Sequence, residues 1–163
     1  MFRLNGKLGA ACGAAILSLA MITLCSAAEP SAGKNVSDMQ FVNFDGMPAC
    51  AFGSVLNGDP AKGASIILAR VQSGCAIPWH WHTPGEHLMM VEGEAELQMK
   101  DGEQFMLRKG GFALMPAHHV HRFRCASKHA ACLFYVYSDG PFDIHYIDAQ
   151  GAEISAQEAL AVH

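Results

Sequence analysis

The chain lacks the patterns that mark nucleic-acid-binding, nucleotide-binding and triad-based hydrolytic proteins. Its 163 residues hold no run of lysine and arginine and no basic stripe interleaved with aromatic residues. With a formal charge of −4, the chain is not expected to bind nucleic acid or anionic membrane surfaces. The glycine patterns of P-loop and Rossmann proteins are absent, and so is any Ser-His-Asp or Cys-His arrangement. Chemistry in this chain must therefore come from other residue types.

The first 28 residues have the layout of a secretory signal peptide. Two basic residues precede an apolar run over 8–25, and small residues at 26–28 supply a cleavage site. An uncleaved membrane anchor is the alternative, because the run approaches the ~18–20 apolar residues that span a bilayer. The small residues favour cleavage, so we expect a periplasmic or secreted protein that is free of the membrane. The mature chain would keep 9 of the 11 basic residues against 15 acidic ones, a formal charge of −6.

Four cysteines remain after the leader: Cys50, Cys75, Cys125 and Cys132. An even number permits disulfides in an oxidising compartment. Cys125 and Cys132 flank a short segment typical of a hairpin turn, which would let them face each other across two strands; alternatively, both are small buried apolar residues. The spacing indicates no pairing for Cys50 and Cys75. None of the four has the spacing of zinc-finger ligands.

Short apolar runs alternate with turn residues from residue 39 onward. Many short strands separated by glycine and proline are typical of an all-β sandwich or barrel. Asp101-Gly102, between two alternating runs, predicts a tight hairpin. Ser155, with Glu158 three residues later, predicts the capped start of a short helix over 155–162. The expected strands cover 50–56, 64–72, 86–91, 94–100, 104–107, 112–115, 120–125, 133–137 and 142–147.

The expected organisation is a single domain that follows the leader. Residues 29–47 would form an N-terminal arm, 48–150 the β domain, and 151–163 a C-terminal tail with the short helix. The sequence shows no internal repeat, no low-complexity tract and no pattern of a second domain.

Candidate metal ligands cluster in one stretch of the chain and one later position. Strand side chains alternate between faces, so His80 and His82 point the same way, and Glu86 shares their parity. His121 lies on a later strand and must be brought in by the fold. Six of the nine histidines fall between residues 80 and 121, which favours a metal site over unrelated surface or core histidines.

Three imidazoles and one carboxylate suit a single divalent transition-metal ion. Iron or manganese is favoured for catalysis, while zinc, nickel and copper are possible and compete well outside the cytoplasm. An ion held by four protein ligands keeps open positions for water, dioxygen or a substrate. This arrangement is typical of a catalytic site.

The motif around these ligands resembles the cupin superfamily. Every fixed position of the first cupin motif is matched in this chain. The motif runs from Gly74 over five residues to His80-Trp81-His82, over three residues to Glu86, and over six residues to Gly93. The second motif runs from Gly110 through Pro116 to His121, with His118 in place of its usual glycine and Cys125 in place of its terminal asparagine. The likeness covers roughly residues 48–148. Over this range the chain resembles exported monocupins of the ChrR-like kind. This resemblance implies a double-stranded β-helix, or jelly-roll barrel, in which His80, His82, Glu86 and His121 hold the ion, and a homodimer.

Neighbouring residues on the same strand faces predict the rest of the site. Leu88 and Met90 share the inward parity of Glu86, and Phe123 shares that of His121, so these three should form the apolar wall of a substrate pocket. His87 should point outward by the same alternation.

Two functions fit this sequence. The first is a small-molecule metalloenzyme with dioxygenase-like, lyase or isomerase chemistry, in which Glu86 is a ligand and a catalytic proton acceptor. The second is a non-catalytic metal- or small-molecule-binding or sensing cupin. The ChrR-type regulators couple their cupin to an anti-sigma domain, for which this sequence shows no pattern, and a leader would remove the chain from the cytoplasm. The sequence therefore favours the enzyme.

Overall fold

The structure, a computed structural model, describes residues 31–161. The predicted leader over 1–28 lies outside the described residues, as does residue 162 at the end of the expected helix. None of the helices within residues 31–161 has the length and apolar character needed to cross a membrane.

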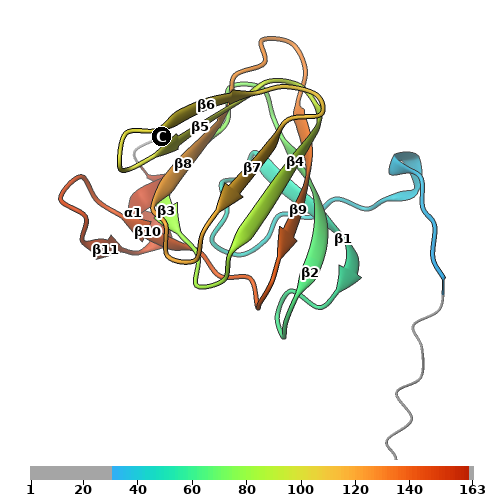
Figure 1. The fold of residues 1–163 in the computed structure, drawn as a ribbon, viewed down its shortest axis with the longest axis horizontal. Coiled ribbons are helices and arrows are strands. Elements are labelled where there is room, and N and C mark those ends of the chain that lie inside the picture. The colour runs from blue at the N-terminus through green and yellow to red at the C-terminus, as the bar shows by residue number, and fades with distance from the viewer. Residues whose placement is uncertain (1–30, 162–163) are drawn as a thin grey trace, which may run out of the picture. The chain divides into compact units, whose positions relative to one another are not determined.

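Within residues 31–161, eleven strands form two antiparallel sheets (Figure 1). The five-stranded sheet, in the order β1-β2-β9-β4-β7, consists of Ala51–Gly58 (β1), Ser65–Val71 (β2), Cys132–Ser138 (β9), Glu86–Glu92 (β4) and Phe112–Met115 (β7). The six-stranded sheet, in the order β11-β10-β3-β8-β5-β6, consists of Glu153–Ile154 (β11), His145–Ile147 (β10), Ala76–Trp81 (β3), His121–Cys125 (β8), Ala95–Met99 (β5) and Gln104–Leu107 (β6). A 3-10 helix, Val36–Asp38 (η1), precedes the sheets and an α-helix, Ala156–Leu160 (α1), follows them.

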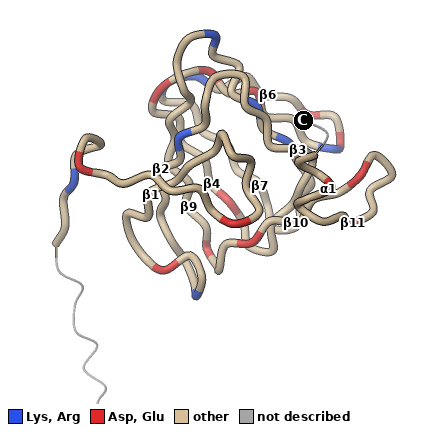
Figure 2. Tube along the Cα trace, turned by 180° about the vertical axis from the view of Figure 1, so that it is seen from behind, with Lys and Arg blue, Asp and Glu red and all other residues tan. Residues whose placement is uncertain are grey.

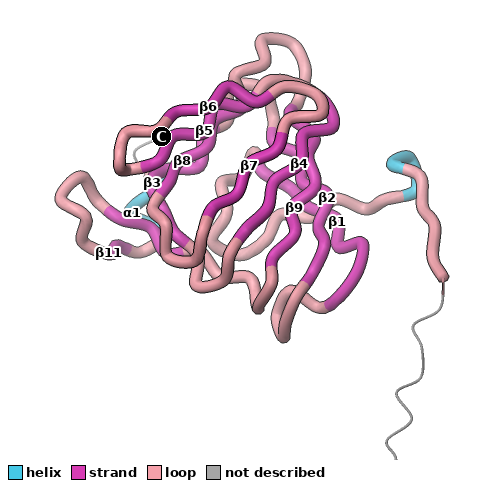
Figure 3. The backbone as a smooth tube through the Cα atoms, viewed as in Figure 1, coloured by secondary structure: helices cyan, strands magenta, loops and turns pink. Residues whose placement is uncertain are grey.

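The strands form two facing sheets (Figure 3). Buried apolar side chains from both sheets form one common core. Strand β8 shows the reason in its sequence, because its first, third and fifth residues are buried and the two arginines between them are exposed. The rings of Phe123 in β8 and Phe134 in β9 meet across the interior with centroids 4.9 Å apart. The predicted all-β jelly roll is confirmed.

Local signals in the sequence correctly predicted two further features. The Asp101-Gly102 turn joins β5 to β6, which pair from Ala95 with Leu107 to Gln98 with Gln104. Ser155 caps α1 with a full capping box, since its side chain accepts from the backbone of Glu158 and the Glu158 side chain accepts from the backbone of Ser155. Around the barrel, acidic residues lie interspersed with basic ones (Figure 2).

The strand expected over 142–147 is shorter in the structure and begins at His145. Its partner β3 ends at Trp81, which pairs with His145, so the residues before His145 have no neighbouring strand. The backbone N–H of Phe142 instead donates to the carbonyl of Pro60. The segment before β10 is therefore irregular, which frees Phe142 and Ile144 to face the interior.

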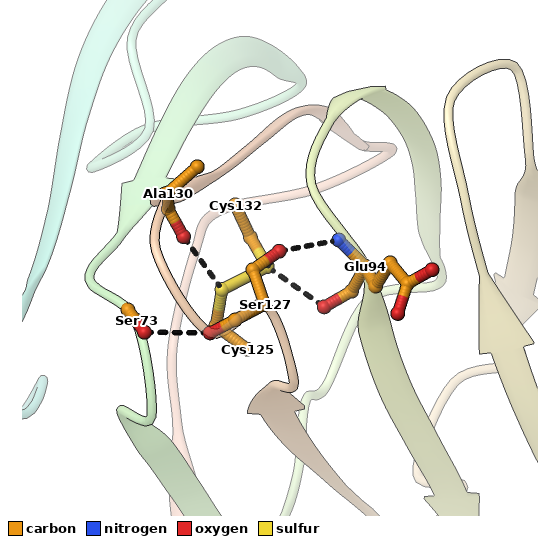
Figure 4. Close-up of a disulfide and its surroundings, with 6 residues drawn as sticks. All are labelled: Ser73, Glu94, Cys125, Ser127, Ala130 and Cys132. Carbon is orange, nitrogen blue, oxygen red and sulfur yellow. Dashed lines mark hydrogen bonds between the residues drawn. A yellow bond between two sulfur atoms is a disulfide. The ribbon is translucent and has the colours of Figure 1, made fainter.

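The prediction of a hairpin between Cys125 and Cys132 is wrong. Strand β8 belongs to the six-stranded sheet and β9 to the five-stranded sheet, so the chain crosses between sheets at this point. A disulfide nevertheless joins the two cysteines, across a sequence separation of 7. The hydroxyl of Ser127 in the crossing accepts the N–H of Glu94 at 2.7 Å, and that of Ser73 donates to the Ser127 carbonyl (Figure 4).

A second disulfide joins Cys50 and Cys75, 25 residues apart. Cys50 directly precedes β1 of one sheet and Cys75 directly precedes β3 of the other. Both disulfides therefore tie one sheet to the other. Cys75 and Cys125 lie at the ends of β3 and β8 that are opposite to His80 and His121.

Candidate metal centre

The structure brings the four predicted ligands together inside the barrel. His80 lies on β3, His121 on β8 and Glu86 at the start of β4, while His82 directly follows β3. The ring nitrogens that His80, His82 and His121 offer lie within 4.8 Å of one another. A carboxylate oxygen of Glu86 lies 3.6 Å from Nε2 of His82 and 3.8 Å from Nε2 of His121. Donors from both sheets thus converge on one point.

A β-bulge in β3 turns His80 toward the interior. Ile77 pairs with Phe123 and His80 pairs with His121, so three steps along β3 match two steps along β8. Without the extra residue, strict alternation would place Ile77 and His80 on opposite faces. Pro78 lies within this irregular stretch, where its missing N–H removes no ladder bond.

Backbone carbonyls orient all three imidazoles. Nδ1 of His80 contacts the carbonyl of Pro78 at 2.6 Å, and Nδ1 of His121 contacts that of His119 at 2.8 Å. Nδ1 of His82 makes the same kind of contact with the Asp143 carbonyl. A carbonyl only accepts, so each Nδ1 carries the hydrogen and each Nε2 keeps its lone pair for an ion.

Burial favours the neutral form of His80 and His121. His80, His82 and His121 are all buried. Burial lowers the pKa of His80 well below 6.5, and the neighbouring His121 and His82 lower it further. Burial also lowers the pKa of His121, although Glu86 opposes the shift. Three imidazole nitrogen donors beside a carboxylate suit a divalent transition metal, so the three-histidine group is able to hold one.

The loop before His121 departs from the cupin motif in sequence, and its backbone is left-handed at the residue that departs. His118 has φ 60°, in the left-handed region, at the position where the cupin motif has glycine. Its N–H donates to the carbonyl of His82 at 2.8 Å, which ties this loop to the segment after β3. The backbone of His118 therefore adopts a strained conformation that glycine would adopt freely.

Replacing His118 with glycine is expected to raise the free energy of unfolding by about 1 kcal/mol, because the left-handed penalty disappears. Thermal and urea unfolding of the metal-free protein would measure the gain. His129→Gly is the matched control: His129 is an exposed loop residue outside the left-handed region, so glycine there should be neutral or destabilising. Equal effects of the two substitutions would contradict the strain at residue 118.

A cavity of about 70 Å³ adjoins the candidate ligands. Of the three predicted wall residues, Leu88 and Phe123 line it. Among the described residues, Met90 is buried in the core but does not line the cavity, because it lies further along β4 than Leu88. The prediction treated each inward residue of the strand as equally close to the ion.

Other lining residues come from segments that strand alternation cannot place. Phe44 and Met47 lie in the segment expected to be an arm, which is fastened to β1 by the Val42–Gly53 bridge. Phe142 lies in the irregular segment before β10, with its ring 6.2 Å from that of Phe44 and 5.5 Å from that of His82. No periodic signal marks these residues, although each is an apolar side chain in a stretch of turns.

The tryptophans beside the histidines face away from the cavity. Lys100 and Arg122 lie over the ring of Trp79, at 5.3 and 4.9 Å from its centroid. The ring of His145 stacks on Trp81 with centroids 3.9 Å apart. Burial alone would lower the pKa of His145, but the carboxylates of Glu153 and Asp143 outweigh it and raise that pKa. His87 points outward as predicted and lies near Phe112 and Tyr137.

Comparisons with known proteins agree with this geometry. A family model described as a cupin domain matches residues 67–137, a range that contains all four candidate ligands. An RmlC-like cupin structure from Ralstonia eutropha JMP134 matches with a TM-score of 0.61 and 18% identity, covering 77% of this chain and 78% of that one. An RmlC-like cupin from Shewanella frigidimarina NCIMB 400 matches with a TM-score of 0.56 and 16% identity, covering 69% and 93%.

A third similar structure is described as DMSP lyases RdDddP and RnDddQII. It has a TM-score of 0.52 and 21% identity, and the match covers 60% of this chain and 53% of that one. No curated protein matches the sequence. At these identities the structural matches show a shared fold and do not select a reaction.

Proposed function

Because the chain belongs to the cupin superfamily, we propose that it is a metalloenzyme acting on a small molecule, with one divalent transition-metal ion held by His80, His82, Glu86 and His121. The observation that carries this proposal is the convergence of three imidazoles, each oriented by a backbone carbonyl, and one carboxylate beside an apolar cavity. An iron or manganese ion at this point would supply Lewis acidity or redox chemistry; zinc, nickel and copper fit the same donors.

Each protein group has a defined role in the proposed enzyme. The backbone carbonyls that accept from Nδ1 hold the imidazole planes in place and keep Nε2 free of a proton. Glu86 would neutralise part of the positive charge of the bound metal ion. Because its carboxylate lies at the cavity, it is also able to accept a proton from a substrate. The apolar walls provide the surface against which the body of a substrate would pack. Dioxygenase-like chemistry is the leading proposal, and a lyase or isomerase is consistent with the fold shared with the DMSP lyase structure.

Oxygen consumption of the iron- and manganese-loaded protein tests the catalytic proposal. Panels of phenols, β-diketones and thiols should include at least one substrate that accelerates oxygen uptake, and Glu86→Gln should suppress that uptake. Product analysis by mass spectrometry would detect lyase or isomerase turnover that consumes no oxygen. A fully metal-loaded protein that transforms no compound in either assay would favour the non-catalytic binding or sensing cupin.

We also propose that the protein is exported to the periplasm or beyond the cell. The leader-like residues 1–28 motivate this, and two disulfides within residues 31–161 support it, because such bonds persist mainly in oxidising compartments. Fractionation of cells that express the full chain would find it outside the cytoplasm, shortened at its N-terminus. Full-length protein in the cytoplasmic fraction would contradict the proposal.

A homodimer is the proposed assembly, through the outer face of the five-stranded sheet. Phe112 and Leu114 on the edge strand β7 are 56% and 49% exposed, and Met89 on β4 pairs with Phe112. Tyr137 on β9 is exposed beside them, across His87. Large contiguous apolar surface on a soluble protein marks an interaction site, and a two-fold contact would let the same face cover itself.

The double substitution Phe112→Ser and Leu114→Ser is expected to shift the protein from dimer to monomer, because it removes the most exposed apolar side chains of that face. Sedimentation velocity over a range of concentrations would measure the shift. Phe105→Ser, at an exposed phenylalanine on β6 of the other sheet, should leave the dimer intact. A monomeric wild type, or an unchanged double variant, would rule out this interface.

A further inference from the structure

Polar groups in the cavity are confined to the candidate ligands. The cavity has twenty-one lining residues, and four of them are His80, His82, Glu86 and His121. The other seventeen are aliphatic, aromatic, methionine, alanine or glycine residues. Among these described lining residues there is no lysine, arginine, serine, threonine, tyrosine, asparagine or glutamine. Among the lining side chains, the candidate ligands are therefore the only polar partners that a molecule in this cavity can meet.

This distribution has a direct energetic consequence for ligands. Each apolar group that a ligand buries against these walls gains hydrophobic free energy. A hydroxyl, ammonium or carboxylate placed against the same walls would lose its hydration without a compensating bond. The site therefore favours one polar head group with an apolar body and disfavours molecules with polar groups at both ends.

The size of the cavity further restricts which ligands fit. Its volume of about 70 Å³ is less than half of the ~150 Å³ of an apolar cavity that accepts benzene. A short aliphatic body fits this space, whereas a ring with substituents would require Phe44, Met47, Phe142 or Ile144 to move. These four side chains come from the two irregular segments that precede β1 and β10.

We infer that the substrate is a small, short-chain molecule with one metal-directed polar group and an otherwise apolar body. This inference rests on the proposed metalloenzyme function and specifies its substrate. It excludes sugar acids, amino acids and dicarboxylates, whose second polar group would face the apolar walls without a partner.

A series of alkyl hydroxamic acids tests the inference on the mature, disulfide-bonded protein loaded with cobalt(II). The hydroxamate head binds the ion and perturbs the visible cobalt spectrum, so a titration yields Kd directly. From acetohydroxamic to butyrohydroxamic acid, Kd should fall about fourfold per added methylene, which corresponds to ~0.8 kcal/mol. The monohydroxamate of succinic acid, which ends in a carboxylate, should bind roughly a hundredfold more weakly than butyrohydroxamic acid.

Two outcomes of this titration would overturn the inference. One is a Kd that does not change with chain length, which would mean that the chain stays in solvent. The other is equal binding of the carboxylate-terminated compound, which would mean that the walls offer a polar partner. Val136→Thr, which places a hydroxyl on the wall at nearly constant volume, should bring the Kd of 4-hydroxybutyrohydroxamic acid closer to that of butyrohydroxamic acid by several-fold.

A xenon titration of the metal-free protein separates this inference from the metal proposal. Xenon binds apolar cavities and needs no ion. The methyl resonances of Ile67, Leu88 and Val136, all of which line the cavity, should shift on xenon binding, while those of Val42, an exposed residue outside the cavity, should not. If the protein binds xenon but cannot be loaded with any metal, only the metal proposal is rejected. Absent xenon shifts at the three lining residues would reject the apolar cavity itself.

Discussion

Replacing His121 with alanine is expected to lower the affinity for a divalent transition metal by more than about a hundredfold. Loss of a residue that merely orients a ligand already costs 10–100-fold in affinity, and loss of a ligand should cost more. The buried position of His121, with Nε2 3.8 Å from Glu86, leaves no other described histidine able to replace it. Competition with a metal-chelating indicator, combined with elemental analysis of the purified protein, would measure the change.

His87→Ala is the matched control for this substitution. His87 directly follows Glu86 in the sequence but lies on the outer face of β4, beside Tyr137 and Phe112. Its removal should leave metal affinity within about twofold of wild type, since it contributes no group to the cavity. Stoichiometric metal in His121→Ala, or equal losses in both variants, would disprove the proposed centre. Glu86→Gln, which keeps the shape of the side chain and removes its charge, should fall between the two.

Removing the Cys50–Cys75 disulfide by the double substitution Cys50→Ala and Cys75→Ala should cost about 3.5 kcal/mol of unfolding free energy. The reason is loop closure: the bond restrains a 25-residue separation in the unfolded chain. The Cys125–Cys132 bond closes a separation of only 7 residues, so its double alanine variant should lose ~2.5 kcal/mol. Urea unfolding of the metal-free proteins, monitored by tryptophan fluorescence, would give both values.

The order of the two losses is the informative part of this experiment. Loop closure predicts the larger loss for the longer loop, independent of how the bonds pack. Wild-type protein unfolded in the presence of a reductant supplies the comparison in which both bonds open without any substitution. A loss of less than 1 kcal/mol for each double variant, or the reverse order, would contradict a role of the unfolded state in the stability of this barrel.

The sequence alone determined the class of fold because the signals for it are local. Runs of four to eight residues with alternating burial, each ended by glycine or proline, form strands wherever they lie in the chain; β6 and β7 have the predicted bounds. The capping box of Ser155 and Glu158 and the Asp101-Gly102 turn depend on neighbours within three or four residues. Each of these features was predicted correctly because no distant contact is needed to form it.

Part of the candidate site could also be predicted from the sequence. The spacing of His80, His82 and Glu86 placed them together, and the structure sets them with His121 around one point. Their role as metal ligands stays a prediction that the His121 experiment tests. The structure adds the reason that the spacing works: β3 ends at Trp81 and carries a bulge, so His80 and Ile77 both face inward although they are three residues apart.

Only the tertiary structure decided which distant segments meet. The pairing of Cys50 with Cys75 and the change of sheet between Cys125 and Cys132 follow from how the two sheets close on each other, which no spacing encodes. The same closure brings Phe44 against Phe142, almost a hundred residues later, and keeps Met90 out of the cavity. Alternation assigns a side chain to a face of a strand, whereas the depth along that face and the partner across it depend on long-range packing. For this protein, the sequence alone therefore determined the strands and the candidate donors, and the fold decided the shape and the apolar character of the cavity beside them.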